Sequence, residues 1–508
     1  MGSPMPSLSL PDILTLIPEH TLLKHSGSSV VYDHITLDSR KATSSSVFVA
    51  LCGMQMDARR FISACNSSLI LVDKWSDKWS EEAEAWNKTI IQVSDARRDM
   101  AIIASALTGY HARQMKMIGI TGTNGKTTTT WMLSHLLLCC GRDQNSLAKI
   151  GTIGTIGPHI NGEALPNTDG FTTPESPGLQ RTLRQFVTQG CGVCIMEVSS
   201  IGLMMQRVGN IQFDVAAFTN FTQDHLDIHH SMEEYLQEKR KLFQAHVHSS
   251  SVSILVADQP ETANTPVTYG RTIRLSTTNT ENATYDGWIE NPTFSIEGSK
   301  FTFHLPHEMD SQEFYVPLIG RHNIENAMVA ISIAVVLGYT PATIAHAFRS
   351  LPQVPGRMER VSSPKGWHAF VDYAHTPDAL EQSIQSLRQL CTGRLWVLFG
   401  CGGDRDRRKR PQMGAIAYEH ADGVWITSDN PRSEPPRQII DDILTGIPSK
   451  CQKPIQDIVD RRVAIESAST FLNAGDVLLI AGKGHETYQV IDGIQYHFDD
   501  REEIRQYC

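Results

Sequence analysis

Residues suited to binding a polyphosphate stand together at positions 117–130, which read M-I-G-I-T-G-T-N-G-K-T-T-T-T. Gly122 and Gly125 allow the backbone to approach the anion, which the amide groups of a following helix N-terminus then face. Lys126 supplies a positive charge, and the Thr127 hydroxyl is placed to bind Mg²⁺. Isoleucine replaces the first glycine of the usual P-loop pattern, which leaves the shorter string T-G-T-N-G-K-T. The segment predicts nucleotide binding; the alternative is an ordinary glycine turn before an unrelated helix.

Charged side chains gather at three further places in the middle of the chain. Glu197 follows an apolar run, where a carboxylate is either a Mg²⁺ ligand beside the phosphate cradle or a solvated strand-end acid. Residues 224–230 read D-H-L-D-I-H-H, which indicates a metal-binding loop or polar residues that aid solubility. Residues 239–241 read K-R-K on an expected helix, and such a run is usually a solvated face.

Four polar segments follow apolar strands in the last third of the chain. In α/β folds, ligands bind at the carboxyl ends of the strands, so four polar ends together suggest a ligand-binding face. Each of them alone would be a routine loop between a strand and a helix. The segments are Asp372–Pro377, Gly400–Asp406, Ser428–Arg432 and Ala481–Glu486.

Short apolar runs that alternate with helical stretches must position these side chains. The alternation predicts an α/β protein with mainly parallel sheets, interrupted by a β-rich portion around residues 280 to 320. A helix is expected after residue 320, ending near Gly338, and Leu351–Gly356 reads as a linker because its prolines and glycine resist helix. The expected strands are 47–51, 69–72, 90–93, 193–198, 215–219, 369–371, 395–399, 423–427 and 477–480.

The bulk properties exclude several classes of protein. The chain has 508 residues, enough for about two to four domains, and its formal net charge of −10 argues against general nucleic-acid binding. There is no run of about 18 apolar residues and no signal peptide pattern. The C-x-x-C at Cys191 and Cys194 has no second pair at metal spacing. We therefore expect a cytoplasmic protein with reduced thiols, no membrane span and no nucleic-acid partner. A monomer is also expected, although these properties do not determine the oligomeric state.

Taken together, the motifs resemble those of the ATP-dependent Mur ligases of peptidoglycan synthesis. T-G-T-N-G-K-T alone is shared with folylpolyglutamate synthetases, but E-V-S-S, D-H-L-D, D-Y-A-H-T-P-D and G-K-G-H-E in this order are more selective. The resemblance runs from Leu37 to Glu486. It implies an α/β fold of three domains. Residues 1–113 would bind the UDP-sugar, residues 114–352 would form a central P-loop ATPase with a parallel sheet, and residues 353–508 would form a Rossmann-like amino-acid-binding domain.

The resemblance also implies where ATP and Mg²⁺ bind. The catalytic residues would be Lys126, Glu197, His225 and Lys239, with Lys239 modified to a carbamate that acts as a carboxylate-like Mg²⁺ ligand. The other proposed metal ligands are Thr127, Glu197 and His225. Asn323 and Asn326 would approach adenine, Arg357 the phosphates and Asp372 the ribose. The phosphate loop itself would be Gly122, Thr123, Asn124, Gly125, Lys126, Thr127 and Thr128.

A second implied set would bind UDP-N-acetylmuramoyl-L-alanyl-D-glutamate. Three positions depart from the family pattern: Ile201 follows E-V-S-S where many members have histidine, Met205 stands where glutamine is common, and Asp57-Ala58 replaces Asp-Gly. The nucleotide-sugar residues would be Leu37, Ser39, Met54, Gln55 and Met56, and the muramoyl-dipeptide residues would be Thr172, Thr173, Ser199 and Arg207.

The string D-N-P-R bears on the incoming amino acid. Its arginine, Arg432, can bind a carboxylate through two parallel hydrogen bonds. Meso-diaminopimelate has such a carboxylate at its far end and L-lysine has none, so lysine would leave Arg432 unpaired. We therefore expect diaminopimelate as the substrate. The implied pocket comprises Arg405, Asp429, Asn430, Pro431, Arg432, Gly482 and Glu486, with Glu486 suited to an ammonium group.

The implied reaction is an ATP-driven ligation of a carboxylate to an amine through an acyl phosphate. The nearest alternatives are an L-lysine-adding ligase, a ligase of another muramoyl precursor, or a folylpolyglutamate-type ligase. D-N-P-R followed by G-K-G-H-E discriminates against the last two. A nucleotide-binding regulatory protein is an alternative of another class, and it would need the phosphate cradle without the other polar strand ends.

Overall fold

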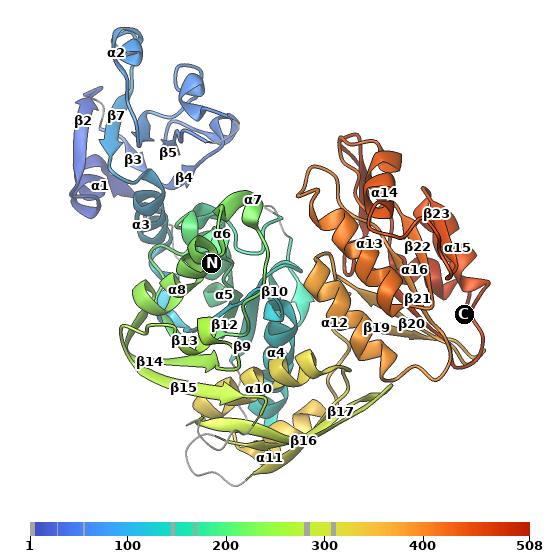
Figure 1. Cartoon of the computed structure of the whole chain (residues 1–508). Coiled ribbons are helices and arrows are strands. Elements are labelled where there is room, and N and C mark those ends of the chain that lie inside the picture. The colour runs from blue at the N-terminus through green and yellow to red at the C-terminus, as the bar shows by residue number, and fades with distance from the viewer. Residues whose placement is uncertain are drawn as a thin grey trace.

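The computed structural model contains three main β-sheets, each with helices packed against it (Figure 1). It describes residues 6–27, 29–53, 56–143, 148–166, 170–278, 285–305 and 311–508. Each main sheet lies within one of the three expected domains, and the α/β class is confirmed. The domain boundaries expected near residues 113 and 352 stay a prediction.

The N-terminal part carries a five-stranded sheet of order β2-β7-β6-β5-β4, parallel except for the β2–β7 pair. The predicted strands at 47–51, 69–72 and 90–93 correspond to β5, β6 and β7. The elements are β1 (Leu8–Ser9), α1 (Leu10–Leu16), β2 (His20–Lys24), β3 (Val31–Tyr32), β4 (His34–Thr36), β5 (Ser46–Val49), β6 (Leu69–Val72), α2 (Asp77–Ala83), β7 (Thr89–Val93) and α3 (Ala96–Thr108).

The central part is built on an eleven-stranded sheet of order β11-β10-β9-β12-β8-β13-β14-β15-β16-β17-β18. Its middle, from β9 to β16, is parallel, and the predicted β-rich portion adds the antiparallel strands β17 and β18. The strands are β8 (Lys116–Thr121), β9 (Lys149–Ile153), β10 (His159–Ile160), β11 (Glu163–Ala164), β12 (Cys191–Glu197), β13 (Phe213–Phe218), β14 (Val247–Val256), β15 (Arg271–Ser276), β16 (Gly287–Ser295), β17 (Gly298–His304) and β18 (Gln312–Val316).

Helices cover both faces of the central sheet. Ile118 of β8 packs in one core cluster with Leu133 of α4, whereas Met117, one residue earlier, packs in a second cluster with Phe186 of α5. A strand buried on both faces is apolar at every position, which explains the continuous apolar runs in the sequence. The helices are α4 (Lys126–Asp143), α5 (Ser176–Thr188), α6 (Ser200–Met204), α7 (Leu226–His229), α8 (Met232–Ala245), α9 (Pro260–Ala263), α10 (Arg321–Val336) and α11 (Pro341–Phe348).

The C-terminal part has a six-stranded sheet of order β19-β20-β24-β21-β22-β23, parallel apart from β19. The strands predicted at 395–399 and 423–427 are confirmed to the residue. The elements are β19 (Glu359–Ser362), β20 (His368–Asp372), α12 (Pro377–Arg388), β21 (Leu395–Phe399), α13 (Lys409–His420), β22 (Gly423–Thr427), α14 (Pro436–Leu444), β23 (Ile455–Ile458), α15 (Arg461–Ser469), β24 (Val477–Ala481), β25 (Tyr488–Ile491), β26 (Ile494–His497) and α16 (Asp500–Arg505).

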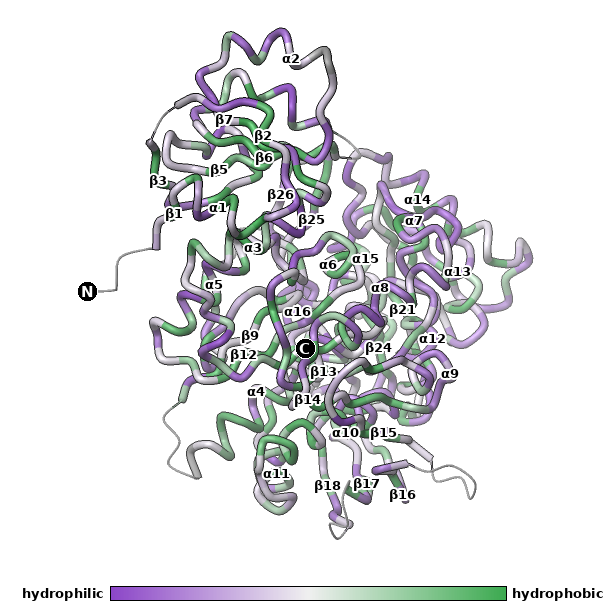
Figure 2. Tube along the Cα trace, turned by 90° about the vertical axis from the view of Figure 1, so that its left-hand side faces the viewer, coloured by the Kyte–Doolittle hydropathy of each residue, from purple (hydrophilic) through white to green (hydrophobic). Residues whose placement is uncertain are grey.

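Hydropathy along the chain follows this architecture. Figure 2 shows hydrophobic stretches along interior strands such as β6 and β21, with hydrophilic stretches along much of the outer loops. No helix among the described residues combines the length and the apolar character needed to span a bilayer. The predicted linker, Leu351–Gly356, contains neither helix nor strand and joins α11 to β19.

Candidate active site

The phosphate loop joins β8 to α4, and α4 begins at Lys126 as the sequence predicts. The end of β13 holds the loop: the Asn124 amide donates to Asn220 Oδ1 at 2.8 Å, and Thr219 Oγ1 donates to Asn124 O at 2.7 Å. Gly125 has a φ of +85°, and a Cβ there would lie 2.1 Å from Asn326 Oδ1. Only glycine therefore fits at this position without displacing Asn326 or straining the loop.

Thr127 and Glu197 meet beside the loop. Thr127 Oγ1 donates to Glu197 Oε2 at 2.9 Å, and Thr155 donates to the same carboxylate through both its amide (3.0 Å) and its hydroxyl (3.0 Å). Glu197 is only 1% exposed, so the alternative of a solvated strand-end acid is wrong. Arg357, directly after the linker and before β19, reaches Thr127 Oγ1 at 3.4 Å.

Lys239 lies in the interior rather than on a wet face. Its side chain is 1% exposed, and its Nζ donates to Gly122 O at 2.8 Å. The Nζ of Lys126 donates to the same oxygen at 2.8 Å, so two lysines share one acceptor. Burial, together with the nearby charge of Lys126, holds the pKa of Lys239 well below its ordinary value. The solvated-face reading of the K-R-K run is therefore wrong for Lys239, whereas Lys241 has a side chain that is 40% exposed.

The D-H-L-D-I-H-H segment contains the short helix α7 and divides its histidines. His229 is fully buried, its Nε2 lies 2.9 Å from Ser200 Oγ, and burial lowers its pKa to about 4. It is a hydrogen-bonded core histidine. His225 is 38% exposed and lies 3.4 Å from the carboxylate of Asp224. Among the described residues, no group of three or more His, Cys, Asp or Glu side chains could by itself hold a metal ion.

The residues expected around adenine and ribose line one cavity of about 80 Å³. Asn326 Nδ2 donates to Asn323 Oδ1 at 3.2 Å, and both side chains are buried. Asp372, at the end of β20, accepts the Met358 amide at 2.7 Å. The structure thus brings Asn323, Asn326, Arg357 and Asp372 together with the phosphate-loop residues Asn124, Gly125 and Thr128.

The residues expected around the muramoyl-dipeptide also lie together. Thr173 Oγ1 donates to Glu197 O at 3.0 Å and lies 3.1 Å from Ser199 Oγ, while Ser199 caps α6 through the Gly202 amide. Arg207 donates to Thr173 O at 3.0 Å, and Thr172 Oγ1 lies 3.1 Å from Thr155 Oγ1. These side chains therefore surround the same strand end as Glu197.

The residues expected at the nucleotide sugar lie in the N-terminal part. Leu37 directly follows β4, and Ser39 begins a turn of 3₁₀ helix capped by Asp38. Met56 is 52% exposed. Met54 and Gln55 lie outside the described residues.

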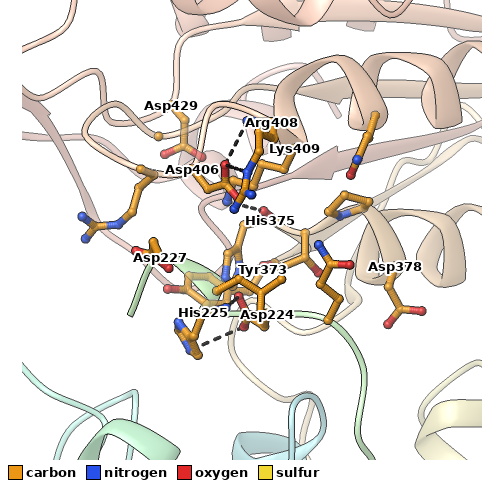
Figure 3. Close-up of a pocket in the computed structure, with 18 of the residues that line it drawn as sticks. Asp224, His225, Asp227, Tyr373, His375, Asp378, Asp406, Arg408, Lys409 and Asp429 are labelled. Carbon is orange, nitrogen blue, oxygen red and sulfur yellow. Dashed lines mark hydrogen bonds and ion pairs between the residues drawn. The ribbon is translucent and has the colours of Figure 1, made fainter. Parts of the chain in front are cut away.

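A cavity of about 750 Å³ is lined by the central and C-terminal parts together (Figure 3). Asp224, His225 and Asp227 approach it from the central side, and Asp429, Asp406 and Lys409 from the C-terminal side. The expected amino-acid residues Arg405, Asp429, Asn430, Arg432, Gly482 and Glu486 all line it, and Pro431 lies within the same turn.

The hairpin β25–β26 holds Arg432 in place. The Arg432 backbone has a φ of +54°, its amide donates to Val490 O at 3.0 Å, and its carbonyl accepts the Asp492 amide at 2.8 Å. Its Nη1 donates to Gly403 O at 2.8 Å. Burial and the neighbouring Asp429 raise the pKa of Glu486. The cavity thus places a guanidinium near two carboxylates, which suits a ligand that carries both an ammonium and a carboxylate.

Two family models match the chain: the Mur ligase middle domain over residues 120–334, and the Mur ligase, glutamate ligase domain over residues 356–484. The chain is 39% identical over 485 residues to UDP-N-acetylmuramoyl-L-alanyl-D-glutamate–2,6-diaminopimelate ligase of Gloeobacter violaceus, with 93% of each protein covered. The chain belongs to the Mur ligase family. A Geobacillus thermodenitrificans protein of the same name is 38% identical over 491 residues and covers 94% of this chain and 95% of that relative.

Solved structures agree with this assignment. A structure with that same ligase name matches 99% of both chains with a TM-score of 0.65 and 30% identity. MurF from Acinetobacter baumannii matches 94% of this chain and 96% of its own with a TM-score of 0.63. Because its identity is only 19%, it shows a shared fold.

Three residues of this Mur ligase were not among the predicted site residues. His375 lines both the large cavity and the adenine-side cavity, Lys409 Nζ donates to His375 O at 2.8 Å, and Asn220 holds the phosphate loop. His375 precedes Thr376, which caps α12, and Pro377, its first residue. The signal was available for His375 and Asn220, because each lies in a polar segment after a strand, whereas Lys409 begins α13.

Proposed function

We propose that this chain catalyses the ATP-dependent ligation of meso-2,6-diaminopimelate to UDP-N-acetylmuramoyl-L-alanyl-D-glutamate. One observation carries the proposal. Residues 223–228, which directly follow Thr222, line the same cavity as the Arg432 turn. Thr123 Oγ1 donates to Thr222 O at 3.1 Å, which ties that segment to the loop. An acyl group activated beside the loop can therefore meet an amine held across the cavity. Relatives at 39% and 38% identity are named for this pair of substrates.

The chemistry requires activation because a carboxylate is a poor acyl donor. The side-chain carboxylate of the D-glutamyl residue would attack the γ-phosphate of ATP, releasing ADP and forming an acyl phosphate. The amine of diaminopimelate would then attack the acyl carbon and expel phosphate, forming the amide. Lys126 would leave its contacts with Gly122 O and Thr123 O and neutralise charge on the transferred phosphoryl group. Closure of the C-terminal part over the cavity, with the linker near Pro352–Gly356 as the hinge, would protect the acyl phosphate from water.

The residues present fit Mg²⁺ beside this loop. Thr127 and Glu197 place a hydroxyl and a carboxylate 2.9 Å apart, and Mg²⁺ prefers such oxygen ligands together with phosphate and water. We propose that Thr127, Glu197, His225 and Lys239 as a carbamate would hold it. Bound Mg²⁺ would neutralise phosphate charge there. The carbamate is supported by the crowding of Lys239 and Lys126 on one carbonyl, because the modification replaces a buried cation with an anion.

Arg432 supports diaminopimelate over L-lysine. We propose that it binds the far carboxylate, while Asp429 and Glu486 bind the far ammonium. The Leu37, Ser39, Met54, Gln55 and Met56 set would bind the UDP-sugar, and the Thr172, Thr173, Ser199 and Arg207 set the muramoyl-dipeptide. We further propose that the enzyme works as a monomer in the cytoplasm, where ATP and nucleotide-sugar precursors are present.

Mass spectrometry of products tests the proposed reaction. Purified protein is incubated with ATP, UDP-N-acetylmuramoyl-L-alanyl-D-glutamate and an equimolar mixture of diaminopimelate and L-lysine. We expect the diaminopimelate adduct, ADP and phosphate, and no adduct from Lys126→Ala. A lysine adduct as the main product would overturn the substrate assignment. Absence of any adduct, with Lys126→Ala indistinguishable from the parent in phosphate release, would overturn the reaction itself.

A further inference from the structure

Lys483 is a buried cation directly beneath the amino-acid side of the large cavity. It lies on the loop after β24, and its side chain is fully buried. Its Nζ lies 3.3 Å from Asn430 Oδ1, 3.4 Å from Glu486 Oε2 and 3.9 Å from Asp429 Oδ1. All three acceptors line the cavity. The ammonium group therefore supports the cavity wall from behind.

Asn430 links the same groups into one network. Its Nδ2 donates to Glu486 Oε2 at 2.7 Å, and its Oδ1 accepts the Val490 amide at 2.9 Å. One oxygen of Glu486 is thus held by two donors, Asn430 and Lys483. The loops after β22 and β24 are joined through this oxygen.

Another buried cation beneath these loops is already neutralised. Arg461 and Asp500 are both fully buried and form two contacts of 2.7 Å. Arg461 also donates to Ser428 O at 3.4 Å and to Ala481 O at 3.0 Å, where the two loops begin. Its charge is matched by Asp500. Lys483 is therefore left to balance the acids of the cavity.

Among Arg432 and the groups joined by the Lys483 network, the charges are equal in number, while Arg405, which also lines the cavity, donates to Asp404 O at 3.0 Å outside this network. Asp429 and Glu486 are acidic, while Lys483 and Arg432 are basic. The far end of diaminopimelate carries one ammonium and one carboxylate and is neutral overall, whereas the far end of L-lysine carries only an ammonium. Without Lys483, these groups would carry an excess negative charge, which suits the cationic far end of L-lysine better than the zwitterionic far end of diaminopimelate.

We propose that Lys483 is a positioning residue that sets the charge of the cavity for a zwitterionic far end and so helps to select diaminopimelate over L-lysine. The inference rests on the proposed function. Lys483 acts through Asp429, Asn430 and Glu486 and does not itself touch the substrate. Arg432 supplies the attractive contact for the far carboxylate. Lys483 removes the electrostatic advantage that a substrate without this carboxylate would otherwise have.

The test compares kcat/KM for the two amino acids in variants that remove the charge of Lys483. Lys483→Met keeps a similar length, and Lys483→Gln keeps a hydrogen-bond donor. We expect the ratio of diaminopimelate to lysine to fall by on the order of tenfold or more in both, mainly through a lower KM for L-lysine. Lys453→Met is the matched control, because Lys453 Nζ donates to Tyr418 O at 2.6 Å and Glu419 O at 2.9 Å away from the cavity. Its ratio should equal that of the parent.

A second measurement separates charge from structure. In Lys483→Met combined with Glu486→Gln, the charges are equal in number again, so the ratio should rise above that of Lys483→Met alone. A purely structural role for Lys483 predicts a further loss in the double variant.

The pH dependence of KM for diaminopimelate gives an independent readout. The groups that face Glu486 are Asp429, Lys483, Arg461 and the hydroxyls of Tyr373 and Tyr488. Loss of the Lys483 charge raises the pKa of Glu486 further, and the ionised carboxylate binds the ammonium. In Lys483→Gln, KM should therefore begin to rise at a higher pH than in the parent as the pH falls.

The outcomes are distinct. If both Lys483 variants bind ADP like the parent yet keep its ratio and its KM–pH profile, Lys483 does not set the selectivity. If both variants fail to bind ADP, the double variant is compared with the parent instead, and a ratio well below that of the parent would overturn the inference. Failure of the proposed function has a different signature, since the parent itself would then form no diaminopimelate adduct.

Discussion

Replacing Lys239 with methionine should separate stability from activity. Lys126 Nζ and Lys239 Nζ each lie 2.8 Å from Gly122 O, so the two nitrogens are no more than twice that distance apart. Two like charges about 5 Å apart repel by on the order of 3 kcal/mol at an effective dielectric constant of about 20. Burial of an ammonium adds a further cost. In the unmodified parent with both lysines charged, Lys239→Met removes both terms, while Gly122 O keeps the hydrogen bond from Lys126.

We therefore expect the free energy of unfolding to stay level or to rise by about 1 to 3 kcal/mol. Activity should fall by at least about a hundredfold, because the proposed carbamate ligand is lost. Chemical denaturation gives the first quantity, and phosphate release with all three substrates gives the second. The unmodified and carbamylated forms of the parent can be distinguished by intact-protein mass under mild conditions.

Lys241→Met is the matched control on the same helix. Lys241 is 40% exposed and pairs with Glu238 at 2.6 Å, so its loss should change stability by less than about 0.5 kcal/mol and leave activity at the parent level. The reasoning is refuted if Lys239→Met is strongly destabilised yet retains the parent's kcat, because Lys239 would then be a structural lysine without a role in phosphoryl transfer.

Three further predictions concern other parts of the site and its support. Arg432→Met should lower kcat/KM for diaminopimelate by roughly a hundredfold, since a charge-assisted pair is lost, while the reaction with L-lysine should not fall. An equal loss for both would contradict the proposed contact. Gly125→Ala should abolish ADP binding as measured by calorimetry. The new Cβ would lie 2.1 Å from Asn326 Oδ1, and the backbone there has a φ of +85°. Unaltered affinity would show that the loop tolerates a side chain. Hydrogen bonds from Arg410 lower the pKa of Glu434 from 4.5 to about 2. The ionised carboxylate therefore stabilises the fold above pH 4.5, and this stabilisation is lost as the pH falls towards 2. In Glu434→Gln this part of the acid-induced loss should be absent from thermal melts, and an unchanged pH profile would count against it.

The strands of the C-terminal sheet were predictable because they are buried on both faces. Residues 395–399 and 423–427 are fully buried in β21 and β22, and continuous apolar runs between polar loops have no other reading at this length. The phosphate loop was equally clear, since its glycines and its lysine follow a strand and open a helix. The residues of the D-N-P-R motif after β22 lie in the wall of the large cavity, and their role in binding the amino acid stays a prediction.

Burial of charged side chains was not predictable from the residues alone. The K-R-K run at residues 239–241 has no local feature that tells its buried first lysine from its exposed last one. The family resemblance pointed to Lys239 as a site residue. Its contact with Gly122 O depends on how α8 packs beside β8. His229 in the D-H-L-D-I-H-H segment is a similar case, because its partner Ser200 lies on a different helix.

The amino-acid sequence by itself determined the elements and the chemistry available at their ends, because apolar periodicity and turn residues are local properties. Only the tertiary structure decided which ends meet. β24 inserts between β20 and β21, although it comes last of the three along the chain, and this places the Gly482–Glu486 loop between those after β20 and β21. Sheet order depends on long-range packing of the whole core, so no local pattern records that Lys483 supports Asp429 and Glu486 from behind.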